Sequence, residues 1–371
     1  MAGARTRAGG RRGGWEDPAV RVRMHDDEVL VDEALVRALL RDQMPELADR
    51  ALTVVEPWGT DNAIWRLGDD LVVRLPRIEW ATGQVHRERS WLPVLAPHLS
   101  VPIPEPVAVG EPGRGYPWAW AVHRWLPGRP ASFEDQRDPV RFAADLARFV
   151  AELRSVPTDG APPARNRARP LREYDSATRT AIAGAAHLID AAAALAVWEE
   201  ALAAPPHPGP PVWVHGDLDG NCLLVDGRLG GVVDWGSACA GDPAVEVQVV
   251  WSNLFDDDGR RRFVDDLGVD DATLTRSRGA AINQACAALP YYLDTYPLIV
   301  ERSWHKLAAL GVGPATTTAG TRYRVSSPPV HDTRNPVPGV VQREDEIRDA
   351  PDRPGLEFVP VARRTQRDEA S

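Results

Sequence analysis

The chain has 371 residues, 43% of them hydrophobic, so it can bury a large core in about two structural units. Its formal net charge of −10 argues against a protein that binds nucleic acid, because contact with phosphates needs concentrated positive charge. The first 23 residues lack an apolar signal region, and no later stretch approaches the length of a membrane span. We therefore expect a cytoplasmic protein without a membrane partner.

The few cysteine and lysine residues limit which bonds, metal sites and catalytic groups the chain can contain. Cys222, Cys239 and Cys286 are odd in number and widely spaced, which predicts neither a disulfide framework nor a zinc site. Lys306 is the only lysine, so chemistry usually assigned to lysine must be carried out by another residue.

Strand patterns dominate the chain before Leu126-Pro127-Gly128. The Gly- and Arg-rich residues 1–23 are expected to be disordered, and Asp32 is expected to cap a helix over 31–40. The elements that follow are predicted strands at 52–55, 63–67 and 71–75, a helix at 84–95, a Pro-rich connector and a strand at 118–125. We expect residues 24–126 to form a small lobe built on antiparallel strands.

Helical patterns dominate after this break. Asp138 and Pro139 begin a helix whose apolar residues form one stripe as far as Arg154. An alanine-rich helix is predicted over 176–202, and two more helices begin near Pro243 and Ala272. We expect a helical lobe over residues 127–312 and a disordered tail over 313–371.

The most informative stretch is a predicted hairpin with Asp-Gly at 226–227 between two apolar runs. If its turn has two residues, counting back along the ladder places Asn221 opposite Val232. Asn221 and Asp234 then emerge at the same open end, and Asp217 enters that end from the preceding loop. Three oxygen-bearing side chains therefore converge.

This set of oxygens suits magnesium-assisted phosphoryl transfer. Magnesium takes oxygen ligands and often only one or two of them from protein, a role that Asn221 and Asp234 fit. Phosphoryl transfer mainly needs positioning, charge neutralisation and one carboxylate that accepts the hydroxyl proton. Asp217 fits that last role.

The motifs resemble those of aminoglycoside phosphotransferase-like small-molecule kinases, relatives of protein kinases, choline kinases and homoserine kinases. The resemblance runs from about residue 31 to 310 and is most specific at His215-Gly216-Asp217-Leu218 with Asn221, Val233-Asp234-Trp235-Gly236 and Gly241-Asp242-Pro243-Ala244. It implies an α+β, two-lobed protein-kinase-like fold with ATP and Mg²⁺ between the lobes. The acceptor it implies is a small-molecule hydroxyl, with an aminoglycoside or another hydroxylated antibiotic as the leading candidate.

The resemblance also assigns roles to particular residues. Asp217 would be the catalytic base, Asn221 and Asp234 the magnesium ligands, and His215 and Asp242 supports of the catalytic loop. The nucleotide would be bound by the phosphate loop Gly59, Thr60, Asp61 and Asn62, by Arg74 with its helix partner Glu88, and at adenine by the backbone of Val122, His123 and Arg124. Asp256, Asp257 and Asp258 would present carboxylates to a cationic acceptor.

Two departures from the family leave alternatives open. Arg74 stands where the family has a phosphate-binding lysine, and only three residues separate Asp217 from Asn221 where the family has four. Either Gly220 lets the backbone compensate, or Cys222 occupies the asparagine position and Asp219 supplies an oxygen. The second hypothesis for function is therefore a nucleotide-binding pseudokinase or regulatory module. A protein kinase is disfavoured, because the sequence has no Asp-Phe-Gly and no Ala-Pro-Glu activation segment.

Overall fold

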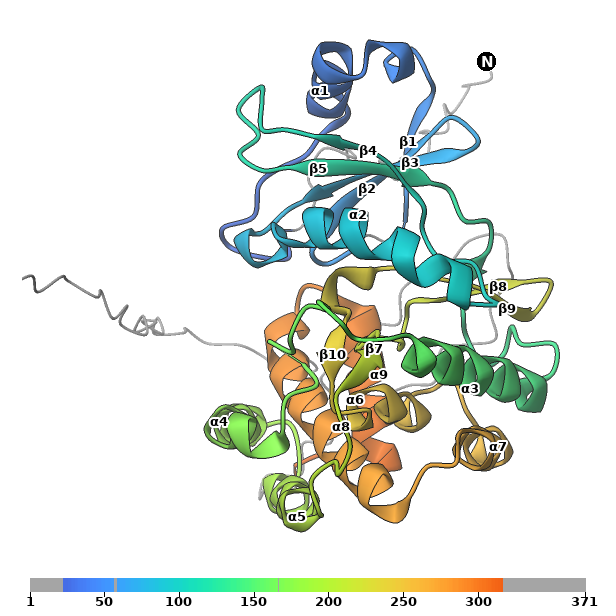
Figure 1. The fold of residues 1–371 in the computed structure, drawn as a ribbon. Coiled ribbons are helices and arrows are strands. Elements are labelled where there is room, and N and C mark those ends of the chain that lie inside the picture. The colour runs from blue at the N-terminus through green and yellow to red at the C-terminus, as the bar shows by residue number, and fades with distance from the viewer. Residues whose placement is uncertain (1–22, 57–58, 166, 316–371) are drawn as a thin grey trace, which may run out of the picture. The chain divides into compact units, whose positions relative to one another are not determined.

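A five-stranded antiparallel sheet forms the centre of the N-terminal lobe (Figure 1). The computed structural model describes residues 23–56, 59–165 and 167–315, so the disorder predicted for 1–23 and 313–371 lies outside the described residues except at 23 and 313–315. At 313–315 the prediction is wrong, because Gly313 O accepts from Asp190 N and Ala315 N donates to Leu188 O. The strands, in the order β1-β2-β3-β5-β4 across the sheet, are β1 (Leu52–Val54), β2 (Asn62–Leu67), β3 (Leu71–Pro76), β5 (Trp120–Arg124) and β4 (Pro106–Gly110).

Two helices accompany this sheet. The first, α1 (Glu33–Gln43), begins as predicted at Asp32, whose side chain accepts a hydrogen bond from Leu35 N at 2.8 Å. Its buried face joins the apolar side chains of β2, β3 and β5 in one core cluster. The second, α2 (Gln84–Leu95), has the predicted bounds and lies between the sheet and the helical lobe (Figure 1). Arg87 of α2 donates to Gly236 O at 2.9 Å, so α2 contacts the C-terminal lobe directly.

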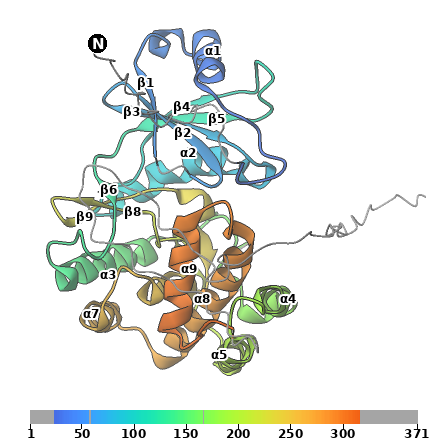
Figure 2. The same cartoon turned by 180° about the vertical axis from the view of Figure 1, so that it is seen from behind.

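Helices make up most of the C-terminal lobe, where α3 packs on α7 and α8 on α9 (Figure 2). They are α3 (Pro139–Ser155), α4 (Asp175–Ala185), α5 (Ala191–Ala203), α6 (Ala244–Val247), α7 (Asp257–Leu267), α8 (Asp271–Tyr292) and α9 (Pro297–Ala309). Two small sheets, with strand orders β6-β8-β9 and β10-β7, comprise β6 (Arg129–Pro130), β7 (Val212–Val214), β8 (Cys222–Val225), β9 (Arg228–Val232) and β10 (Cys239–Gly241). The expected α+β, two-lobed fold is confirmed.

Some boundaries differ from the sequence prediction. The helix expected over 176–202 is two helices, because Leu188 and Ile189 turn into the core and Asp190 caps α5. The Pro-rich connector contains β4, whose first residue, Pro106, stands at a strand start at the sheet edge. The three cysteines are buried and free, as expected. None of the described helices combines the length and apolarity that crossing a bilayer requires.

Candidate active site

The hairpin β8–β9 contains one residue more than the predicted two-residue turn and regular ladder require. The turn at 226–227 is present, but the β8–β9 register then shifts by one residue at Gly230. The predicted pairing of Asn221 with Val232 is therefore wrong, since Cys222 faces Val232 instead. Asn221 O accepts a hydrogen bond from Val233 N at 2.9 Å, directly before Asp234. The bulge thus moves Asn221 one position closer to Asp234.

Residues 215–217 form a loop held by hydrogen bonds on both sides. His215 is fully buried; its Nδ1 accepts from Asp217 N at 3.2 Å, so its Nε2 donates to Val233 O at 2.9 Å. Burial lowers the pKa of His215, which keeps the imidazole neutral and suits this pattern of one acceptor and one donor. The loop is consequently tied to the end of the hairpin.

Glu246 also holds the loop at 215–217. It was not among the site residues predicted from the sequence. Its buried carboxylate accepts hydrogen bonds from the backbone N–H groups of His215 and, at 3.4 Å, Gly216. Burial raises the pKa of Glu246 to about 7. The sequence did contain a signal for this role, since Glu246 stands within the apolar run AVEVQVV. An acidic side chain buried in such a run needs specific hydrogen-bond donors.

Asp217 presents its carboxylate to two donors. Arg167 Nη1 lies 2.7 Å from Asp217 Oδ1, and Gln284 Nε2 donates to the same oxygen at 3.1 Å. Burial alone would raise the pKa of Asp217, but the charges of Arg167 and Lys306 outweigh it and hold the pKa below its ordinary value. Asp217 is therefore ionised. Neither Arg167 nor Gln284 was among the predicted site residues.

Asn221 and Asp234 lie at the end of the hairpin that faces the N-terminal lobe. Asn221 Nδ2 donates to Asp217 O at 2.7 Å, and Asp234 adopts a left-handed backbone with φ 61°. The Asp234 side chain is 41% exposed, and one oxygen accepts from Arg74. The pKa of Asp61 is raised by burial and by the negative charges of Asp234 and Asp217. These three carboxylates therefore influence one another across the cleft.

The predicted contact between Arg74 and Glu88 is present, and Arg74 also contacts Asp234, which was not predicted. Arg74 Nη1 donates to both oxygens of the buried Glu88, at 2.7 and 2.8 Å, while Nη2 donates to Asp234 Oδ1 at 2.9 Å. His123 lies behind Glu88, with 3.8 Å between Nε2 and the carboxylate. Burial and the charge of Arg74 lower the pKa of His123 to about 3, so it is neutral. Arg74 alone therefore joins β3, α2 and the catalytic lobe.

The segments predicted to bind the phosphates and adenine lie at the start of β2 and in β5. Asn62 Nδ2 donates to Gln84 Oε1 at 3.1 Å, and Thr60 O lies 3.0 Å from Nε2 of His25. Val122, His123 and Arg124, the predicted adenine-binding segment, lie in β5, which is paired with β3 on one side and β4 on the other. Arg124 N donates to Glu105 O at 2.9 Å, so this N–H group is not available to a base. Binding of adenine by the carbonyl groups of this segment stays a prediction.

The remaining predicted residues lie outside the catalytic loop. Asp242 pairs with Arg276 Nε at 2.9 Å and accepts from Ala244 N at 2.9 Å, which ties the turn before α6 to α8. Asp256 caps α7, and its neighbours Asp257 and Asp258 pair with arginines of the same helix. Because α7 packs on α3, the structure does not bring these three carboxylates to Asp217.

The two alternatives for the short loop can now be compared. Cys222 is fully buried in the core of the C-terminal lobe, and its Sγ lies 3.5 Å from Leu218 O. The Asp219 side chain is 6% exposed, and it pairs with Lys306 Nζ at 2.9 Å. Gly220 has φ +90°, a conformation that suits glycine. Gly220 thus supplies the unusual backbone conformation of the first alternative, and the side chains of Cys222 and Asp219 are both engaged in other contacts.

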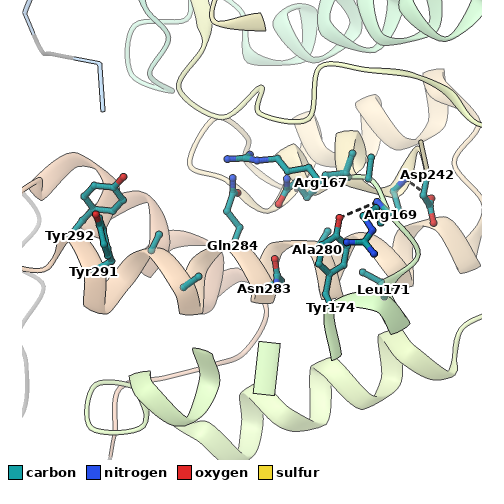
Figure 3. A pocket seen from close by; sticks show the side chains of 16 residues that line it. Arg167, Arg169, Leu171, Tyr174, Asp242, Ala280, Asn283, Gln284, Tyr291 and Tyr292 are labelled. Atoms are coloured by element: carbon teal, nitrogen blue, oxygen red, sulfur yellow. Dashed lines mark hydrogen bonds between the residues drawn. The ribbon is translucent and has the colours of Figure 1, made fainter. Parts of the chain in front are cut away.

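A pocket of about 310 Å³ opens beside Asp217. Arg167 and Gln284, the two donors to Asp217, lie in the middle of its lining (Figure 3). Tyr291 and Tyr292 of α8 lie to one side of them, and Tyr174 and Leu171 lie to the other (Figure 3). Small apolar side chains, among them Ala280, Ala287 and Ala288, also line the pocket. Among the described residues, no group of three His, Cys, Asp or Glu side chains is arranged to hold a metal ion by itself.

The chain is similar to solved structures of phosphotransferases. The chain is similar to the GDP and kanamycin complex of APH(2")-IIia, with 20% identity, a TM-score of 0.60, and coverage of 74% of this chain and 98% of that one. It is also similar to macrolide 2'-phosphotransferase type I (20% identity, TM-score 0.53, coverage 76% and 98%) and to macrolide 2'-phosphotransferase MphH from Brachybacterium faecium (26%, 0.50, 75% and 97%). The fold is that of the protein-kinase-like phosphotransferases.

The family follows from the sequence itself. A model of the family described as "Phosphotransferase enzyme family" matches residues 53–281, which is more than half of the chain, and the chain belongs to that family. It is therefore a phosphotransferase. A search of curated proteins found no match.

Proposed function

We propose that this enzyme transfers the γ-phosphoryl group of ATP to a hydroxyl group of a small molecule. The observation that carries the proposal is that the ionised Asp217 bonds to two side chains that line the adjacent pocket, Arg167 and Gln284. An acceptor in this pocket would present a hydroxyl to Asp217. Similar solved structures contain GDP or ADP, which supports nucleotide binding near Asp217 and Asp234.

The proposed reaction is an in-line displacement. The acceptor oxygen forms a bond to the γ-phosphorus while the bond from that phosphorus to the β,γ-bridging oxygen breaks, and ADP leaves. The hydroxyl proton passes to Asp217. Because its pKa is held low, Asp217 stays ionised and accepts the proton only as the attacking oxygen becomes acidic. Arg74 would contact the phosphates, since its guanidinium donates bidentately to anions.

Asn221 and Asp234 would hold Mg²⁺. They fit it chemically, because Mg²⁺ takes few protein oxygens and completes its coordination with phosphate and water. The mutual influence of Asp61, Asp217 and Asp234 also favours a cation near them. When bound, Mg²⁺ would neutralise phosphate charge.

The pocket favours a hydroxylated acceptor with apolar surface over a polycationic one. Carboxylates at or beside the pocket are already paired, Asp217 with Arg167, Asp242 with Arg276, and Glu173 with Arg169. An ammonium group would therefore have to displace an arginine, whereas alanine and tyrosine side chains offer apolar contact. Macrolide 2'-phosphotransferases are among the similar structures, as are aminoglycoside complexes. In the cytoplasm, phosphorylation of such an antibiotic would confer resistance.

A coupled ADP-release assay tests the proposal. Wild type and Asp217→Asn would be supplied with magnesium-ATP and a panel of aminoglycosides, macrolides and amino alcohols. We expect acceptor-dependent ADP from the wild type and a loss of at least about 100-fold in Asp217→Asn. Equal rates in both proteins would show that Asp217 is not the base. Magnesium-ATP binding by the wild type without turnover across the panel would instead support a nucleotide-binding regulatory module.

A further inference from the structure

Lys306 occupies an unusual position for a lysine. It is the only one in the chain, and it lies on α9 with 4% of its surface exposed. A buried ammonium is costly unless it is paired, and here Nζ lies 2.9 Å from Asp219 Oδ2 and also donates to Gln284 Oε1. Both partners lead to Asp217, since Asp219 is two residues along the same loop and Gln284 donates to its carboxylate.

The Gln284 amide is oriented by its two neighbours. Because an ammonium can only donate, Lys306 requires the amide oxygen to face it. The amide NH₂ group is then directed to Asp217 Oδ1, at 3.1 Å. A flipped amide would place its oxygen against the carboxylate and its NH₂ against the ammonium, and both contacts would be repulsive. Lys306 therefore selects the orientation in which Gln284 is a donor to Asp217.

The same lysine also holds the middle of the loop. Asp219 lies between Leu218, which is 2% exposed, and Gly220, which has φ +90°. A Cβ at Gly220 would come 2.0 Å from Nη1 of Arg302, one helical turn before Lys306 on α9. The short loop is thus packed closely against α9 and bonded to it through Asp219.

The geometry points to Gln284 and Lys306 as positioning residues for Asp217, with Lys306 acting through Gln284 and Asp219. This inference rests on the proposed role of Asp217 as the base. Arg167 is the other donor, and it uses the same Oδ1 atom. Both donors thereby direct Oδ2 to the acceptor hydroxyl, and the chain of contacts from α9 sets the direction from which it accepts the proton.

Steady-state kinetics separate positioning from binding. Gln284→Leu removes the link to Asp217 and leaves the ion pair of Lys306 with Asp219 in place, and Gln284→Glu keeps an acceptor for Lys306 but removes the donor to Asp217. The probe is ADP release from magnesium-ATP with the best acceptor of the panel, or with water if none is used. We expect both variants to lose about tenfold to a hundredfold in kcat, with KM for ATP changed by less than about twofold.

Arg278 supplies the matched control. It lies on the same helix, α8, is not among the residues that line the pocket, and its Nη1 donates to Glu200 Oε2 at 2.9 Å. Arg278→Ala should therefore keep kcat within about twofold. An unchanged kcat in Gln284→Leu, or a loss confined to KM for the acceptor, would overturn the inference.

The single lysine allows a second test that needs no turnover. Protein labelled with ¹⁵N-lysine contains one side-chain ammonium, so its NMR signal reports Lys306 alone. We expect this signal to shift in Gln284→Leu and in Asp217→Asn and to stay in place in Arg278→Ala. A signal unchanged by Asp217→Asn would show that the contact does not reach Asp217.

Failure of the positioning role and failure of the proposed function would give different kinetic results. If Asp217→Asn removes activity while Gln284→Leu does not, the positioning role is wrong and the proposed function stands. If Asp217→Asn retains activity, the assignment of the base is wrong, and the positioning role, which rests on it, is overturned as well.

Discussion

Replacement of Arg74 tests the architecture of the cleft most directly. Its guanidinium donates to both oxygens of Glu88 and to Asp234. Arg74→Met keeps the apolar stem but leaves the Glu88 side chain, which is 2% exposed, without its counter-charge. Removal of one partner from a buried ion pair costs about 3–5 kcal/mol. At about 2–4 °C per kcal/mol, Tm should fall by roughly 6–20 °C.

Two further variants separate charge from geometry. Arg74→Lys keeps the positive charge, but an ammonium lacks the planar fork that reaches Glu88 and Asp234 together. Loss of one charge-assisted hydrogen bond should cost about 1.5–3 kcal/mol and weaken magnesium-ATP binding. The double variant Arg74→Met/Glu88→Gln removes the buried charge along with its partner, so it should recover much of the stability lost in Arg74→Met.

Thermal unfolding followed by circular dichroism measures these differences, and titration calorimetry with magnesium-ATP measures the change in affinity. The reasoning would be refuted if Arg74→Met melted within about 2 °C of wild type. It would equally fail if the double variant were no more stable than Arg74→Met, because Glu88 would then not depend on Arg74 for its charge compensation.

Two other predictions concern stability. Burial raises the pKa of Glu246 from 4.5 to about 7, so the folded chain binds more protons than the unfolded chain in that range and loses about 3 kcal/mol as pH rises through it. The stability of Glu246→Gln relative to wild type should therefore rise with pH in urea titrations, and a constant difference would contradict this. At Gly110, a Cβ would lie 2.0 Å from Cε2 of Trp120, so Gly110→Ala should cost about 1–3 kcal/mol in the same titrations. Its matched control, Gly184→Ala in α4, meets nothing within 4 Å and should stabilise by about 0.5–1 kcal/mol; equal effects at the two glycines would refute the packing argument.

Local signals in the sequence were sufficient for much of the fold. Asp32 and Asp138 cap α1 and α3 because a capping side chain bonds to a backbone N–H only three residues along. The bounds of α2 and the hairpin turn at 226–227 follow from patterns of similar range. Capping, periodicity and turn chemistry all act over a few residues, so one sequence is enough to read them.

The candidate site likewise contains features that local sequence signals predict and features that they do not. Asp217, Asn221 and Asp234 could be named from the sequence because all three lie in or beside one hairpin. The bulge at Gly230 could not be predicted from the sequence. It changes the register of the hairpin but leaves no clear change in the hydrophobic pattern. The β4 strand was missed because its partner, β5, is what makes it a strand.

Only the tertiary structure brought the remaining site residues together. Arg167, Gln284 and Lys306 come from a loop and two helices that lie far from Asp217 in the sequence, and Gln284 is 67 residues away from it. No short-range pattern marks such contacts, because they depend on how α8 and α9 pack against the loop at 215–221. The sequence by itself determined the chemistry of the hairpin, and the packing of the helices decided which side chains orient its carboxylate.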